Sequence, residues 1–82
     1  MLRFYFDTDD TMKLVIDEYG SELPDTMAAG RLARRTLLEM SADLARGSDV
    51  VQCRALVRDE AGNTLFTTEV TLAVIEGPGP SV

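Results

Sequence analysis

One stretch with helical periodicity lies between two pairs of segments whose apolar residues alternate. Residues 2–7 and 12–17 precede it, residues 51–58 and 65–75 follow it, and all four show the period of two that is typical of half-buried strands. Within residues 25–45 one sector of a helical wheel is mainly apolar and contains Ala29, Leu32, Ala33, Thr36, Leu37, Met40 and Leu44. This order predicts an α+β fold, β-β-α-β-β, in which a four-stranded, mainly antiparallel sheet carries one long helix on one face as a two-layer sandwich.

Local signals set the boundaries of these elements. Asp25 follows a proline and is a favourable N-cap, so we expect the helix to run from about residue 25 to residue 45. Gly20 is free to take a positive φ in the turn before Ser21–Pro24, a short extended connection. A loop at residues 59–63, which contains a Gly-Asn pair, closes the second hairpin.

A single helix covers only one face of such a sheet. We therefore expect the other face to lack a cover and to present eight side chains: Arg3, Tyr5, Val15, Arg54, Leu56, Leu65, Thr67 and Glu69. Its larger apolar members form a candidate self-association patch, namely Tyr5, Val15, Leu56 and Leu65. A second candidate is the helix edge formed by Met27, Leu38 and Ala45, which share nearly the same wheel angle away from the buried stripe.

The length also favours association. A chain of 82 residues has room for one domain, expected over residues 1–76, and residues 77–82 (Gly-Pro-Gly-Pro-Ser-Val) are expected to be a flexible tail. So small a domain buries a limited share of its surface, and dimerisation is a common remedy. We therefore expect a homo-oligomer, most simply a dimer.

Charge is unevenly distributed along the chain. The formal net charge is −6, which argues against general nucleic-acid binding. Residues 1–25 carry seven acidic and two basic side chains, whereas residues 26–47 carry two acidic and four basic ones. Three of these arginines, Arg31, Arg34 and Arg35, are candidate contacts for an acidic protein partner, which includes the acidic hairpin of a second copy. The alternative is a solvated face balanced by Glu39 and Asp43.

The residue inventory excludes much catalytic chemistry. The chain has no histidine, so Ser-His-Asp and Cys-His nucleophiles and histidine-containing zinc sites are ruled out. Cys53 is the one cysteine and is in phase with Val51 and Val57, which predicts a buried structural thiol. No phosphate-binding glycine motif occurs. We expect no enzyme activity and no cofactor.

The acidic residues near the N-terminus invite comparison with a calcium loop. Aligning an EF-hand loop on Asp7 places Asp9 and Glu18 at ligand positions, but Met12 occupies the position of the essential glycine. We therefore predict a solvated turn and no metal site. The adjacent pairs Asp17-Glu18 and Asp59-Glu60 point to opposite sides of a strand and do not converge on a substrate.

Localisation follows from what the sequence lacks. No apolar run approaches the length needed to span a bilayer, and no secretory leader is visible. A lone cysteine suits a reducing compartment. We expect a soluble cytoplasmic protein with no membrane partner.

The segment Asp17-Glu18-Tyr19-Gly20-Ser21-Glu22-Leu23-Pro24-Asp25, followed by Ala28-Ala29, resembles a family of short bacterial proteins classed only as a domain of unknown function. A second Asp-Glu-x-Gly hairpin late in that family corresponds to Asp59-Glu60-Ala61-Gly62. The resemblance covers about residues 2–72 and implies membership, but no catalytic residue, cofactor or substrate. Gly30 departs from the pattern, because a stronger helix former is usual there.

A more distant resemblance is to small β-β-β-α-β antitoxin domains. It rests on the aromatic N-terminal hairpin, the short extended Glu22-Leu23-Pro24 and the helix that follows. Such proteins are acidic and oligomeric and bind a partner protein, although this chain lacks the DNA-binding segment that they usually carry. The first functional hypothesis is therefore a non-enzymatic, self-associating interaction domain. The alternative is an antitoxin-like or regulatory module that binds a basic partner through its acidic hairpins, and an enzyme using carboxylates or Cys53 ranks last.

Overall fold

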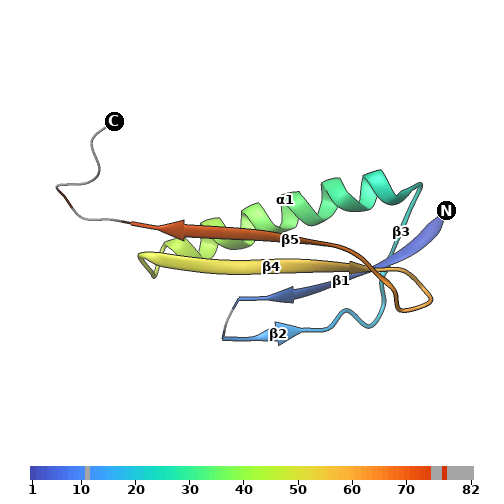
Figure 1. Ribbon diagram of the computed structural model, residues 1–82, viewed down its shortest axis with the longest axis horizontal. Coiled ribbons are helices and arrows are strands. Elements are labelled where there is room, and N and C mark those ends of the chain that lie inside the picture. Colours follow the sequence, from blue (N-terminus) through green and yellow to red (C-terminus); the bar gives the residue numbers. More distant parts are fainter. Residues whose placement is uncertain (11, 75–76, 78–82) are drawn as a thin grey trace.

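One helix lies across an antiparallel sheet (Figure 1), as the sequence predicted. The computed structural model describes residues 1–10, 12–74 and 77. In chain order the elements are β1 (Leu2–Asp9), β2 (Leu14–Val15), β3 (Ser21–Leu23), α1 (Thr26–Ala45), β4 (Val50–Arg58) and β5 (Thr64–Ala73). β3 was expected only as an extended connection. Most of the predicted tail, residues 78–82, lies outside the described residues.

The strands follow the order β2-β1-β4-β5, and every neighbouring pair is antiparallel. β3 also pairs with β1, with Leu2 opposite Leu23 and Phe4 opposite Ser21. β2 pairs further along the same strand, with Thr8 opposite Val15. β2 and β3 therefore act together as one interrupted edge strand beside β1.

The register decides which side chains face the helix. The central strand β4 alternates strictly, and its inward members are buried: Val51, Cys53, Ala55 and Val57. Phe6 of β1 and Phe66 of β5 both lie opposite Val57, so they share the helix side of the sheet. The residues between these positions lie on the uncovered face.

α1 begins where the sequence predicted. The Asp25 side chain accepts a hydrogen bond from the Ala28 backbone N–H at 2.8 Å, a cap that stabilises a helix by about 1 kcal/mol. The helix buries Ala29, Ala33 and Leu37 completely. Two of these three residues are alanines, which lets the helix lie close to the sheet.

The helix is not centred on the sheet. It packs on β4 and β5 and, more lightly, on β3. Among the described residues, eight form the buried core, and four of these are alanine or cysteine: Phe4, Ala29, Ala33, Leu37, Val51, Cys53, Ala55 and Val57. The core is therefore small and lies toward the β4–β5 side of the sheet.

The first predicted hairpin is wrong in its second strand. Regular pairing there is limited to β2, and Met12, Leu14 and Ile16 are exposed instead of contributing to the core. Met12 is 91% exposed. Leu14 lies opposite Asp9, on the face of the sheet that the helix does not cover, so the alternation of a half-buried strand does not bring it into the core.

Candidate interaction surface

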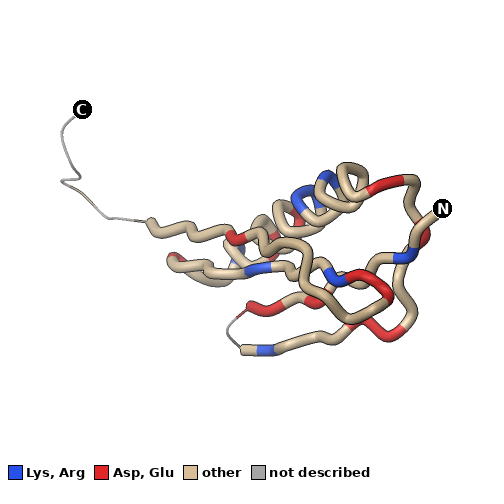
Figure 2. Tube along the Cα trace, turned by 45° about the vertical axis from the view of Figure 1, so that its right-hand side comes forward, with Lys and Arg blue, Asp and Glu red and all other residues tan. Residues whose placement is uncertain are grey.

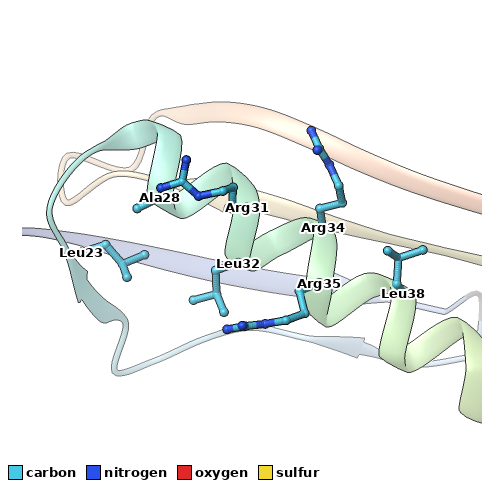
Figure 3. A pocket seen from close by; sticks show the side chains of 7 residues that line it. All are labelled: Leu23, Ala28, Arg31, Leu32, Arg34, Arg35 and Leu38. Atoms are coloured by element: carbon cyan, nitrogen blue, oxygen red, sulfur yellow. The ribbon is translucent and has the colours of Figure 1, made fainter.

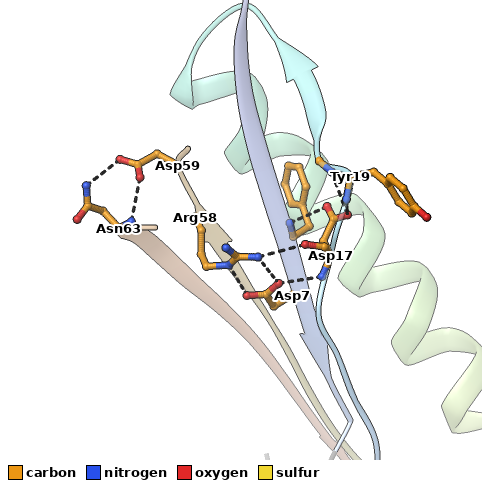
Figure 4. A network of polar contacts seen from close by, with 8 residues as sticks. Asp7, Asp17, Tyr19, Arg58, Asp59 and Asn63 are labelled. Atoms are coloured by element: carbon orange, nitrogen blue, oxygen red, sulfur yellow. Dashed lines mark hydrogen bonds and ion pairs between the residues drawn. The ribbon is translucent and has the colours of Figure 1, made fainter. Parts of the chain in front are cut away.

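A polar network crosses the uncovered face between β1 and β4 (Figure 4). Arg58 binds Asp7 with two hydrogen bonds, from Nε to Oδ2 at 2.6 Å and from Nη2 to Oδ1 at 3.0 Å. The same guanidinium lies over the Tyr5 ring, 5.1 Å from its centre. Asp7 is only 6% exposed, so this cation is the natural counter-charge for a buried carboxylate.

Asp17 fills the gap between β2 and β3. Its carboxylate accepts hydrogen bonds from three backbone N–H groups, those of Phe6, Tyr19 and Gly20, at 3.1 to 3.2 Å. Its own N–H donates to Asp7, and its carbonyl accepts from Arg58. A side chain thus supplies the hydrogen bonds that strand pairing would make elsewhere, and Gly20 completes the turn at φ 74°.

These contacts shift the acid–base equilibria. The Arg58 hydrogen bond lowers the pKa of Asp7 below its ordinary value, against the opposing effect of burial. Burial also acts to raise the pKa of Asp17, but the three N–H donors outweigh it, so that pKa is lowered too. Both groups are therefore held as carboxylates. The sequence placed them in turns and strands but could not pair them, because the register of β1 with β4 was unknown.

Further ion pairs cover the same face. Arg54 of β4 binds Asp9 at 3.0 Å and lies 3.9 Å from Glu69 of β5. Arg3 binds Glu22 at 3.0 Å. The uncovered face therefore carries several ion pairs. Acidic side chains and a turn fill the interruption between β2 and β3 at the edge of the sheet.

The predicted sheet patch does not form as one surface. Tyr5 and Leu56 lie on the uncovered face and are partly buried. Val15 lies opposite Thr8, which places it on the helix side, so the expectation that it shares their face is wrong. Leu65 lies at the irregularity where β5 begins. A one-residue difference in register carries a side chain to the other face, and the sequence does not specify the register.

The predicted helix edge is only partly as expected. Met27 is 69% exposed and Leu38 is 55% exposed. Ala45 instead packs against the core. The three residues share one direction on the helical wheel, but the sheet beneath the helix twists. The same direction therefore points to solvent at Met27 and toward the sheet at Ala45.

The three candidate arginines lie on the solvent side of α1. Arg31, Arg34 and Arg35 are exposed and line a shallow hollow with Leu23, Ala28, Leu32 and Leu38 (Figure 3). Within the described residues none of the three forms an ion pair. Acidic residues concentrate in the loops around β1 to β3 and in the β4–β5 hairpin (Figure 2). The molecule therefore has a basic helix above acidic strand ends.

The feature that sequence reasoning missed is the outer edge of β5. This strand spans ten residues, pairs with β4 along its length, and has no described strand on its other side. It contains no Lys, Arg, Pro or Gly, and its one charged residue is Glu69. Lys, Pro and short length are among the usual devices that block an edge, so their absence was the available signal. The register of β5 on β4 is irregular only near the start of the strand, at Leu65. Near the end of this strand, Leu72 is 42% exposed and Val74 is 54% exposed.

Cys53 is buried, and burial raises the pKa of its thiol, which keeps it protonated. In the part of the chain that the structure describes, no three His, Cys, Asp or Glu side chains are grouped to hold a metal ion. The same part contains no helix long and apolar enough to cross a membrane.

The fold and this surface define a small α+β domain with one closed and one open sheet edge. A comparison with family models matches residues 3–71 to the family described as Domain of unknown function (DUF6894). The chain belongs to this family. Comparisons with curated proteins and with solved structures give no match.

Proposed function

We propose that this chain is a non-enzymatic interaction domain that self-associates through the edge of β5. The observation that carries the proposal is the contrast between the two sheet edges. β5 runs over ten residues beside β4, with one irregularity in register near its start, whereas the opposite edge is divided between β2 and β3, and Asp17 fills the gap between them.

An open edge is a surface with a defined chemistry. Alternate residues of such a strand direct their backbone N–H and C=O groups outward, and another extended strand satisfies these groups best. Association would also cover apolar side chains beside the edge, including Leu72 and Val74. Burial of apolar area of this kind stabilises association by about 25 cal/mol per Å². The small core gives the chain a reason to gain stability in this way.

The alternative, binding of a basic partner through acidic hairpins, has less support. Asp7 and Asp17 are already bound to Arg58 and to backbone donors, and Asp59 is bound to Asn63. Removing these carboxylates from internal contacts would cost the stability that those contacts provide. An enzyme based on Cys53 has less support still, because its protonated thiol is out of reach of solvent.

Sedimentation velocity over a concentration series tests the proposal. We expect a monomer–dimer equilibrium whose dimer fraction rises with concentration. The matched control is Leu14→Lys, which adds a charge to the opposite, closed edge and should leave the equilibrium unchanged. A wild-type protein that stays monomeric at several hundred micromolar, or a dimer that Leu14→Lys dissociates, would overturn it.

A further inference from the structure

We infer that two copies join β5 to β5 in antiparallel orientation about a two-fold axis through Val70, so that the sheet continues from one copy to the other and the two α1 helices lie side by side. This inference rests on the proposed self-association and specifies its geometry. The partner is a second copy of this chain because the edge is complementary to itself in one particular register.

Symmetry restricts the possible registers. A two-fold axis perpendicular to the sheet keeps each face on its own side, so opposite residues must share a face and one residue must lie opposite its own copy. An axis through Glu69 would place two like charges directly opposite each other, which is unfavourable. The axis therefore passes through another residue near the middle of β5.

An axis through Val70 brings apolar side chains together and keeps the two Glu69 side chains apart. On the helix side, Val70 lies opposite its copy, Thr68 opposite Leu72, and Phe66 opposite Val74. Both exposed apolar side chains near the end of the strand thereby gain a neighbour. On the uncovered face, Glu69 lies opposite Thr71 of the second copy, where no charge opposes it.

An axis through Thr68 also avoids the Glu69 pair but is poorer. It would place Leu72 opposite Thr64 and Val74 beside Gly62 in the hairpin loop. The ends of the two strands would then lose their apolar contacts. This register puts Glu69 opposite Thr67 instead of Thr71, which allows an experiment to distinguish the two.

The position of the helix supports the same dimer. α1 lies over β4 and β5, beside the open edge. With strands about 4.8 Å apart, edge-to-edge pairing places the two helix axes about 10 to 14 Å from each other, and the lower end of this range matches the separation of packed helices. An arrangement with the helix over the middle of the sheet would leave a wide gap there.

The exposed leucine of α1 then lies near the axis. α1 and β5 run in the same direction, and Gly30 lies against Phe66. Val70 is about 13 Å further along the strand, which corresponds to about nine helical residues and therefore to the region of Leu38. Leu38, 55% exposed in the single chain, would face its counterpart across the axis.

Charge substitutions at Thr71 test the register. In the inferred dimer, Thr71→Lys places a cation opposite Glu69 of the second copy, and symmetry creates two such pairs. Thr71→Glu places two like-charge pairs there instead. Because each directly opposite charged pair changes stability modestly, the dimer dissociation constant should fall about twofold to thirtyfold for Thr71→Lys and rise by a similar factor for Thr71→Glu.

The same substitutions at Thr67 are the matched control. Thr67 and Thr71 are both exposed and flank Glu69 at the same distance along β5, so their effects within one chain are similar. Thr67 lies opposite Ala73 in the inferred register, and its lysine and glutamate variants should therefore differ little in dissociation constant. Sedimentation at 50 mM salt provides the readout, and 500 mM salt should shrink the Thr71 effects.

The outcomes separate the two proposals. A wild-type protein that never dimerises contradicts both the proposed function and the register. If the protein dimerises and the opposite shifts appear at Thr67 instead of Thr71, the axis passes through Thr68 and the inference is wrong. If neither position responds to charge, Glu69 faces neither of these residues in the dimer, and the inferred register is wrong.

Discussion

Arg58 of β4 and Asp7 of β1 join these two neighbouring strands through a bidentate ion pair, with Nε 2.6 Å from Oδ2 and Nη2 3.0 Å from Oδ1. They are 51 residues apart in the chain. The pair lies on the face that the helix does not cover, and Asp7 is nevertheless buried. Together with Asp17 it holds the connection between β2 and β3 against the centre of the sheet.

Replacing Arg58 tests the importance of this pair. Arg58→Met leaves Asp7 without its cation, so the free energy of unfolding should fall clearly. Arg54→Met is the matched control, because Arg54 lies on the same strand and face but forms a more exposed pair with Asp9. Urea denaturation should show a larger decrease for Arg58→Met than for Arg54→Met. Equal decreases would mean that burial of Asp7 does not matter.

Stability should fall in acid, and Arg58 should determine part of that fall. The pKa of Asp7, Asp17 and Asp59 is lowered in the folded chain, so their contribution is complete above the ordinary value of 3.8 and is lost as the pH falls through the lowered values. We expect the free energy of unfolding to decrease from about pH 5 downward. Arg58→Met removes the main cause of the Asp7 shift, so its decrease between pH 5 and pH 3 should be smaller. A parallel decrease in both proteins would contradict this assignment.

Asp17 should matter more than its acidic neighbour. Asp17→Ala leaves three backbone N–H groups without their acceptor and should lower the free energy of unfolding by about 1 to 3 kcal/mol. Glu18→Ala, at the adjacent exposed position, should be close to neutral. Chemical denaturation of the two variants makes the comparison. Equal effects would show that the turn holds without the Asp17 carboxylate.

Alanine should act in opposite directions at two glycines. Gly30 lies inside α1, and a Cβ there would lie 3.4 Å from Phe66, an ordinary contact, so Gly30→Ala should stabilise the chain by about 0.5 to 1 kcal/mol. Gly20 has φ +74°, and a Cβ there would lie 2.9 Å from the Phe4 carbonyl oxygen. Gly20→Ala should therefore cost about 1 to 3 kcal/mol. Thermal unfolding followed by circular dichroism measures both, and a stabilising Gly20→Ala would show that the turn relaxes.

The Cys53 thiol should be inert in the folded protein. It is buried on β4 and its pKa is raised, so little thiolate is present or accessible at neutral pH. Iodoacetamide labelling followed by mass spectrometry should proceed only under unfolding conditions. Rapid labelling of the native protein would contradict this prediction and would support a reactive cysteine.

The fold was largely predictable from local patterns, and the surface was not. The α1 stripe and the Asp25 cap were found because helical periodicity and capping depend on residues close in sequence. The alternation of Met12, Leu14 and Ile16 predicted half-buried side chains, but all three are exposed. A period of two does not indicate whether another element covers that face of the strand. The Asp-x-x-Gly spacing at Asp17 indicates a turn. Nothing in the sequence indicates that Asp17 also contacts Phe6 and Arg58.

The sequence by itself determined the four long elements β1, α1, β4 and β5, their order and the family, since periodicity and caps are local properties of the chain. Tertiary structure alone decided the register of β1 on β4, the pairing of Asp7 with Arg58 and the position of α1 over β4 and β5. These depend on which distant segments meet, and a shift of one residue exchanges the two faces of a strand. For the same reason the exposed edge of β5 emerged only when the strand order was known.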